Sequence, residues 1–130
     1  MHTRTIAAFL AAGALFAANT AQAQPKGQAD CLRVGQIDSF SAIKGNERAF
    51  LVTDRLHRRF RVNLMSRCGG LDYNMAVGFK TLETGRLACI QRGDTVLSRD
   101  PGVAGNRCPI SSVEPYTAAM EAADKAAAAR

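Results

Sequence analysis

The sequence predicts an all-β domain: a small antiparallel barrel or sandwich of about five to seven short strands, stapled by disulfides and followed by an alanine-rich C-terminal helix. Three observations support this fold class. Apolar and polar residues alternate in several short segments, glycine-containing turn signals separate those segments, and four cysteines lie well apart along the chain. A composition of 47% hydrophobic and 22% charged residues is typical of one folded domain.

Residues 1–23 have the three parts of a cleavable signal peptide. A short positive start contains Arg4, an apolar run extends from Ile6 to Ala18, and Ala21-Gln22-Ala23 forms an A-x-A cleavage site. The apolar run is shorter than the roughly 20 residues of a membrane-spanning helix, so we expect export and no transmembrane segment. The polar residues 24–30 are expected to form a flexible leader.

The four cysteines, Cys31, Cys68, Cys89 and Cys108, all follow the predicted cleavage site. An exported chain meets an oxidising compartment, and none of the four lies in a close C-x-x-C pair that would favour zinc. We therefore expect two disulfides, no metal and no cofactor. The sequence does not choose among the three pairings, although Cys31–Cys108 with Cys68–Cys89 would clamp the two ends of the core.

The β domain is expected to cover residues 31–113. Its clearest strand has Phe60, Val62 and Leu64 alternating with polar residues, which is the pattern of a half-buried strand. Strands are expected near residues 32–43, 48–53, 59–64, 75–79, 87–90, 95–97 and 108–113, and the segments up to residue 64 are interpreted as an antiparallel meander.

Residues 114–130 form the predicted helical tail. Alanine dominates between Ala118 and Ala129, so the helix propensity is high while there is little apolar surface to bury. Pro115 is expected in the first helical turn, and Tyr116 and Met120 are the residues that could dock the helix.

No catalytic residues are expected. His57 is the one histidine after the cleavage site, and the arginines around it would disfavour the imidazolium that a catalytic base must form. We therefore interpret His57 as a hairpin-tip residue without a role. Asp38, Asp54, Asp72 and Asp94 lie beside turns or strand ends, where aspartate commonly bonds to the backbone.

The chain has 17 basic residues against 11 acidic ones, and six of its arginines lie in or near one predicted hairpin. If Phe60 faces the core, Arg59 and Arg61 must face outward. Such a face could bind phosphate, carboxylate or an acidic protein surface, and the alternative is a solvated face that protects a strand from aggregation. Nucleic acid is not expected, because exposed aromatic residues are scarce. The candidate anion-binding residues are Arg48, Arg55, Arg58, Arg59, Arg61 and Arg67.

The cysteine frame resembles a known family. The matching elements are Cys31-Leu32, Ile37-Asp38, Arg67-Cys68-Gly69-Gly70-Leu71, Leu87-Ala88-Cys89, Asp94-Thr95-Val96 and Cys108-Pro109-Ile110. Over about residues 31–113 they resemble a family of small exported proteobacterial proteins known only as a domain of unknown function. The resemblance implies a periplasmic, disulfide-bearing domain without assigned catalytic residues or cofactor.

Three hypotheses follow for the function. The first is a periplasmic non-catalytic module that binds an anionic ligand or an acidic partner through the arginine-rich hairpin. The second is a protein inhibitor of a neutral or acidic periplasmic enzyme, since rigid stapled loops lose little entropy on binding. The third is a small hydrolase that uses a pair of carboxylates.

Overall fold

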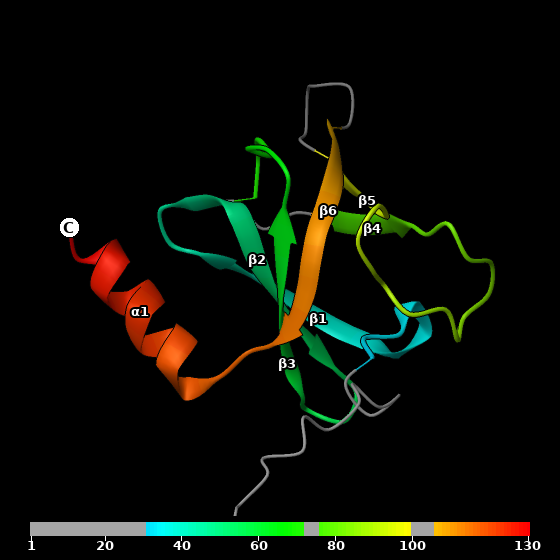
Figure 1. Cartoon of the computed structure of the whole chain (residues 1–130), viewed down its shortest axis with the longest axis horizontal. Helices are drawn as coiled ribbons and strands as arrows, with labels where there is room; N and C mark the ends of the chain where they lie inside the picture. Colours follow the sequence, from blue (N-terminus) through cyan, green and yellow to red (C-terminus); the bar gives the residue numbers. More distant parts are fainter. Residues whose placement is uncertain (1–30, 72–75, 100–105) are drawn as a thin grey trace, which may run out of the picture.

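The computed structural model describes residues 31–71, 76–99 and 106–130, and Figure 1 shows their arrangement. The predicted signal peptide and leader lie outside the described residues, as do Asp72 and Met75. The elements are, in chain order, η2 (Val34–Gln36), β1 (Ile37–Ile43), β2 (Asn46–Asp54), β3 (Arg59–Leu64), β4 (Ala76–Lys80), β5 (Thr95–Arg99), β6 (Asn106–Pro115) and α1 (Ala118–Ala128).

One six-stranded antiparallel sheet has the order β1-β2-β3-β6-β5-β4. It consists of two meanders, β1-β2-β3 and β4-β5-β6, which are joined where β3 pairs with β6. The sheet is curled into a half-barrel, so the predicted fold class is confirmed, as is the first meander. Residues 87–90 differ from the prediction, because they do not form a strand of the sheet. Their contribution is an isolated antiparallel bridge between Cys89 and Arg33.

Aromatic contacts close the open side of the half-barrel. The edge strands β1 and β4 carry Phe40 and Phe79, whose ring centroids lie 5.9 Å apart. The ring of Phe50, on β2, lies 6.4 Å from Phe40 and 6.2 Å from Phe79. The two ends of the sheet are thus brought together by ring packing, which is worth about 1 kcal/mol per pair beyond area burial.

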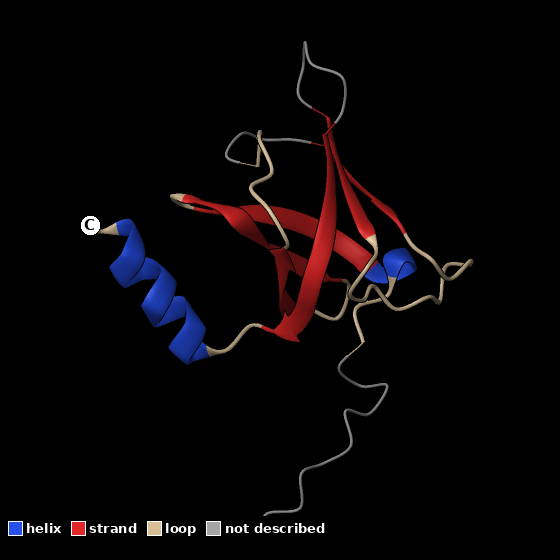
Figure 2. Ribbon diagram, turned by 45° about the horizontal axis from the view of Figure 1, so that its top comes forward, coloured by secondary structure: helices blue, strands red, loops and turns tan. Residues whose placement is uncertain are grey.

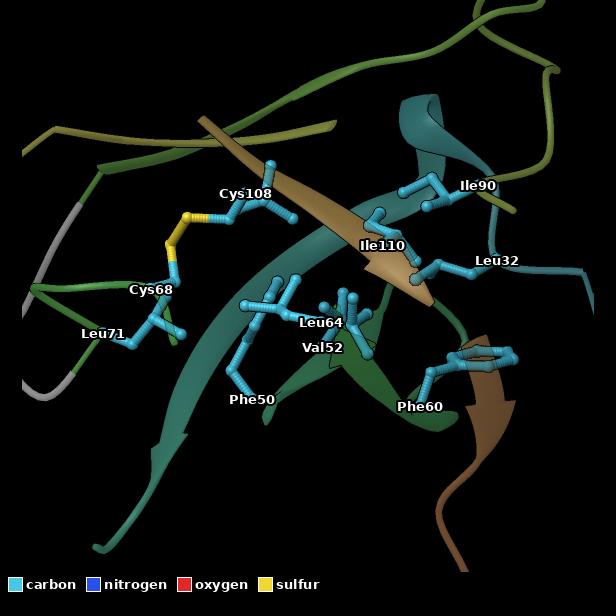
Figure 3. Close-up of a cluster of buried hydrophobic side chains, with 12 residues drawn as sticks. Leu32, Phe50, Val52, Phe60, Leu64, Cys68, Leu71, Ile90, Cys108 and Ile110 are labelled. Atoms are coloured by element: carbon cyan, nitrogen blue, oxygen red, sulfur yellow. A yellow bond between two sulfur atoms is a disulfide. The ribbon is translucent and has the colours of Figure 1, made fainter. Parts of the chain in front are cut away.

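The core fills the concave face of the sheet. Figure 3 shows Val52, Phe60, Leu64 and Ile110 of β2, β3 and β6 within one buried cluster. The strand alternation predicted for residues 59–64 is therefore confirmed. The buried cluster comprises Leu32, Phe50, Val52, Phe60, Val62, Leu64, Cys68, Leu71, Ile90, Val96, Cys108 and Ile110.

The disulfides are Cys31–Cys89 and Cys68–Cys108, so the pairing favoured from the sequence is wrong. The physical reason is a long-range backbone contact. Leu32 accepts a hydrogen bond from the amide of Ile90, and Val34 donates one to the carbonyl of Ala88, which brings Cys31 beside Cys89. Cys68–Cys108 consequently fastens a segment outside the strands to β6, whereas Cys31–Cys89 joins two segments that both lie outside the strands.

The C-terminal helix α1 lies beside the sheet, with its C-terminal half near the free end of the β1–β2 hairpin in both views (Figures 1 and 2). Pro115 ends β6 and does not enter the helix, contrary to the expectation. The helix begins after Thr117, whose side chain accepts a hydrogen bond from the amide of Met120. Among the described residues, no helix is long and apolar enough to cross a membrane.

Removing one disulfide at a time tests the observed pairing. Because sequence separations of 58 and 40 residues close long loops, we expect Cys31→Ala/Cys89→Ala and Cys68→Ala/Cys108→Ala each to lower the free energy of unfolding by roughly 4 kcal/mol. Urea denaturation measures the loss, and peptide mapping without reduction identifies the linked pairs. A Cys31–Cys108 peptide would contradict the structure.

Candidate functional site

The six candidate arginines do not converge on one site. Because β2 and β3 run antiparallel, the hairpin has a turn at one end, with Arg55, Arg58 and Arg59, and an opposite end with Arg48 and Arg67. Arg61 lies between the two ends on β3, opposite Leu51 in the register. The arginines of each group have different partners.

The β2–β3 turn is held by the carboxylate of Asp54. Its side chain is fully buried and accepts hydrogen bonds from the amides of Leu56 and Arg58, at 2.9 and 2.8 Å. The Arg58 guanidinium completes the cage, with Nε and Nη2 each 2.8 Å from Oδ2. Burial raises the pKa of Asp54, but these donors outweigh burial and hold the pKa below its ordinary value.

The same turn places His57 in the left-handed region, with a φ of 61°. This conformation is uncommon for a residue with a side chain, and here the Asp54 carbonyl accepts the His57 amide at 2.9 Å and stabilises it. His57 is exposed at the hairpin tip, as expected. Arg55 and Leu56 are exposed beside it, and 65% of Leu56 is accessible to solvent.

Arg59 and Arg61 face away from the core, as predicted, but both are engaged with α1. Arg61 Nη1 lies 2.7 and 2.8 Å from the two carboxylate oxygens of Asp124, and this pair is largely shielded from solvent. Arg59 Nη1 lies 3.1 Å from Glu121, and its guanidinium carbon is 4.7 Å from the centroid of the Tyr116 ring. Two of the candidate anion ligands therefore fasten the C-terminal helix.

Tyr116 completes the attachment of α1, and Lys125 forms an ion pair within the helix. The Tyr116 hydroxyl donates to Asp124 at 3.1 Å, and burial together with this carboxylate raises the pKa of Tyr116. Lys125 lies 2.9 Å from Glu121, and the pKa of Glu121 is lowered by the hydrogen bond and charge of Lys125 and then by Arg59. Each of the two helix carboxylates thus has two donors.

Arg48 and Arg67 lie at the far end of the hairpin. Arg67 Nε is 3.6 Å from Glu47, and 77% of the Arg67 side chain is exposed, so this contact is worth at most about 1 kcal/mol. No carboxylate pairs with Arg48 or Arg55 in the part of the chain that the structure describes. Of the arginines near the turn, Arg55 is the one that remains available for an external anion.

The buried carboxylates serve the backbone. Besides Asp54, the buried acidic residue among those that the structure describes is Asp94, whose carboxylate accepts hydrogen bonds from the amides of Leu82 and Gln91 at 2.8 and 2.9 Å. Asp38 is exposed on β1. Within residues 31–71, 76–99 and 106–130, no group of three or more histidine, cysteine or carboxylate side chains is placed to hold a metal ion.

The comparison with known families gives one match. A family model described as "Family of unknown function (DUF6491)" matches residues 1–130, the whole chain. The chain belongs to this family. Neither the curated proteins nor the solved structures contain a match. In this DUF6491 member, the four-cysteine frame on which the resemblance rests corresponds to the two disulfides of the structure.

Sequence reasoning missed the carboxylate partners of the outer arginines in this DUF6491 domain. Glu121 and Asp124 are three residues apart and share one side of α1, while Arg59 and Arg61 are two apart and share one face of β3. This matching of acidic helical spacing with basic strand spacing is the signal that could have identified the contact.

Replacing Asp54 tests the turn. We expect Asp54→Asn to lower the free energy of unfolding by about 2 kcal/mol at pH 7, because hydrogen bonds to a charged acceptor are lost. Since the pKa of Asp54 is depressed in the folded state, its contribution is present above the unfolded pKa and is lost as pH falls through the folded pKa. The difference in the free energy of unfolding between Asp54→Asn and the wild type should therefore become smaller toward pH 2.

Urea unfolding at pH 7 and at low pH measures this difference. Asp38→Asn, at an exposed position, is the matched control and should change stability little at either pH. An equal loss of stability in Asp54→Asn and Asp38→Asn would contradict the role assigned to Asp54.

Proposed function

We propose that this chain is an exported, non-catalytic binding module that holds an anionic ligand or an acidic protein surface through the β2–β3 turn. The observation that carries the proposal is the cage around Asp54. It fixes the turn with a buried carboxylate and leaves Arg55 exposed beside it, without an ion pair in the described residues.

Charge and rigidity support this proposal. Residues 54–59 contain three arginines and one aspartate, and the single aspartate is buried against Arg58. The Arg55 amide also donates to the carbonyl of Gln36 at 2.8 Å, which ties the turn to η2. A turn that is already ordered loses little conformational entropy when it binds. The positive excess and the fixed geometry together favour anion recognition at this end of the hairpin.

The exposed side chain of Leu56 favours a second candidate function. It stands at the tip of the turn, 65% exposed and flanked by Arg55. An apolar side chain on a turn that is ordered by the Asp54 hydrogen bonds is suited to enter a pocket of a partner protein. Inhibition of a neutral or acidic enzyme is the corresponding alternative, since a basic turn disfavours a basic target.

The proposed location rests on the signal peptide and the cysteines. The A-x-A site at Ala21 to Ala23 favours cleavage before Gln24, and export to the periplasm would supply the oxidising conditions that both disulfides need.

Arg55→Ala tests anion binding. We expect the domain to be retained on immobilised dextran sulfate at low salt and released as salt screens the interaction. Loss of one unpaired charge should weaken binding about three- to fivefold, as expected for an interaction of about 1 kcal/mol. Arg107→Ala removes the same charge from an exposed position on β6 and serves as the matched control.

Two results would refute anion binding at the turn. One is passage of the wild-type domain through the column at low salt. The other is equal weakening by Arg55→Ala and Arg107→Ala, which would indicate binding by total charge.

Export is tested by fractionating a Gram-negative host that expresses the full chain. We expect the periplasmic fraction to contain a protein that lacks residues 1–23, with all four cysteines oxidised, as intact mass spectrometry would show. Full-length protein with free thiols in the cytosolic fraction would rule the proposed location out.

A further inference from the structure

A groove separates α1 from the β1–β2 hairpin. It has a volume of about 180 Å³. Its lining includes Ile43, Lys44 and Leu51 on the sheet side and Lys125 and Ala128 on the helix side. Nothing in the comparisons assigns a role to this place.

The groove exists because charged contacts, and not apolar packing, attach the helix. None of the residues of α1 is buried, and its links to the sheet are the pairs from Arg59 to Glu121 and from Arg61 to Asp124, with the hydroxyl of Tyr116. These long side chains hold α1 away from the sheet. Ala128, on the groove side, is too short to fill the space.

The floor of the groove is apolar. Ile43, Ala49 and Leu51 form a second buried cluster, separate from the main core, with Tyr116 packed against it. Leu51 lies opposite Arg61 in the β2–β3 register, so this cluster belongs to the outer face of the sheet that α1 covers. A ligand in the groove would therefore meet aliphatic side chains at the bottom.

The rim has one cation without an internal partner. Glu121 is paired with Arg59 and Lys125, and Asp124 with Arg61 and Tyr116, so both carboxylates of the groove are already bonded. Lys44 is exposed, and no carboxylate in the described parts of the chain pairs with it. The charge available to a ligand is consequently positive.

We propose that the groove between α1 and the β1–β2 hairpin binds a small amphipathic anion, with an aliphatic body over Ile43 and Leu51 and a carboxylate head at Lys44. The size excludes a drug-sized ligand, since pockets for such molecules have about 300 Å³ or more. A medium-chain carboxylate has the matching shape and charge. This site is separate from the β2–β3 turn and does not depend on anion binding there.

Octanoate is the probe that tests the groove. Titrated into the ¹⁵N-labelled domain, it should shift the amide signals of Ile43, Lys44, Leu51 and Ala128 in a saturable manner. Lys44→Ala should weaken binding about fivefold, the equivalent of one ion pair of about 1 kcal/mol. Lys80→Ala, at an exposed position on β4, should leave the affinity unchanged.

A variant in which a side chain fills the groove distinguishes specific binding of octanoate from general adsorption. Ala128→Trp places an indole in the space and should abolish the octanoate shifts, whereas Ala126→Trp, at an exposed position of α1 that does not line the groove, should preserve them. Neutral octanol should bind at least fivefold more weakly than octanoate.

Three results would overturn the proposal. The first is the absence of saturable shifts at these residues, and the second is binding that survives Ala128→Trp. The third is a concentration-dependent dimer whose interface signals coincide with the groove and which Ala128→Trp converts to a monomer, because the occupant would then be a second copy of the chain.

Discussion

The alternation of side chains along β3 is the constraint on which the remaining architecture depends. β3 lies between β2 and β6 and joins the two meanders. Phe60, Val62 and Leu64 enter the core, while Arg59 and Arg61 stand on the opposite face. A shift of one residue would exchange these faces and bury two guanidinium groups, which is far more costly than any loop rearrangement. One register thus fixes both the core and the place where α1 attaches.

Most of the positive charge near the β2–β3 turn is neutralised by carboxylates of the same chain. An excess of basic residues around one hairpin suggests a single anion-binding face, yet Arg58 binds the buried carboxylate of Asp54, and Arg59 and Arg61 hold a helix. The contacts of Arg59 and Arg61 hold α1 against the sheet, since no residue of the helix is buried. Among the described residues of this hairpin and the groove, Arg48, Arg55 and Lys44 have no carboxylate partner, and Arg55 and Lys44 lie beside the turn and the groove respectively.

The sequence predicts what depends on local pattern, and it misses what depends on distant contacts. Alternation at Phe60, Val62 and Leu64 predicts strand and face correctly because the period of a strand is a local property. The disulfide pairing depends on Leu32 meeting Ile90, and the helix attachment depends on Asp124 meeting Arg61, contacts between segments far apart in the chain. The turn beside Asp54 correctly predicts that its carboxylate bonds to the backbone, but the contact of this carboxylate with the Arg58 guanidinium depends on the geometry of the turn.

A double-mutant cycle on Arg61 and Asp124 tests the central claim that β3 arginines hold the helix. The pair is shielded from solvent, and one guanidinium nitrogen reaches both carboxylate oxygens, so we expect a coupling energy of about 1 to 2 kcal/mol between Arg61→Ala and Asp124→Ala. Either single change should also remove hydrogen-exchange protection from the amides of α1. Additive effects on stability, with the helix amides equally protected in all four proteins, would contradict the account.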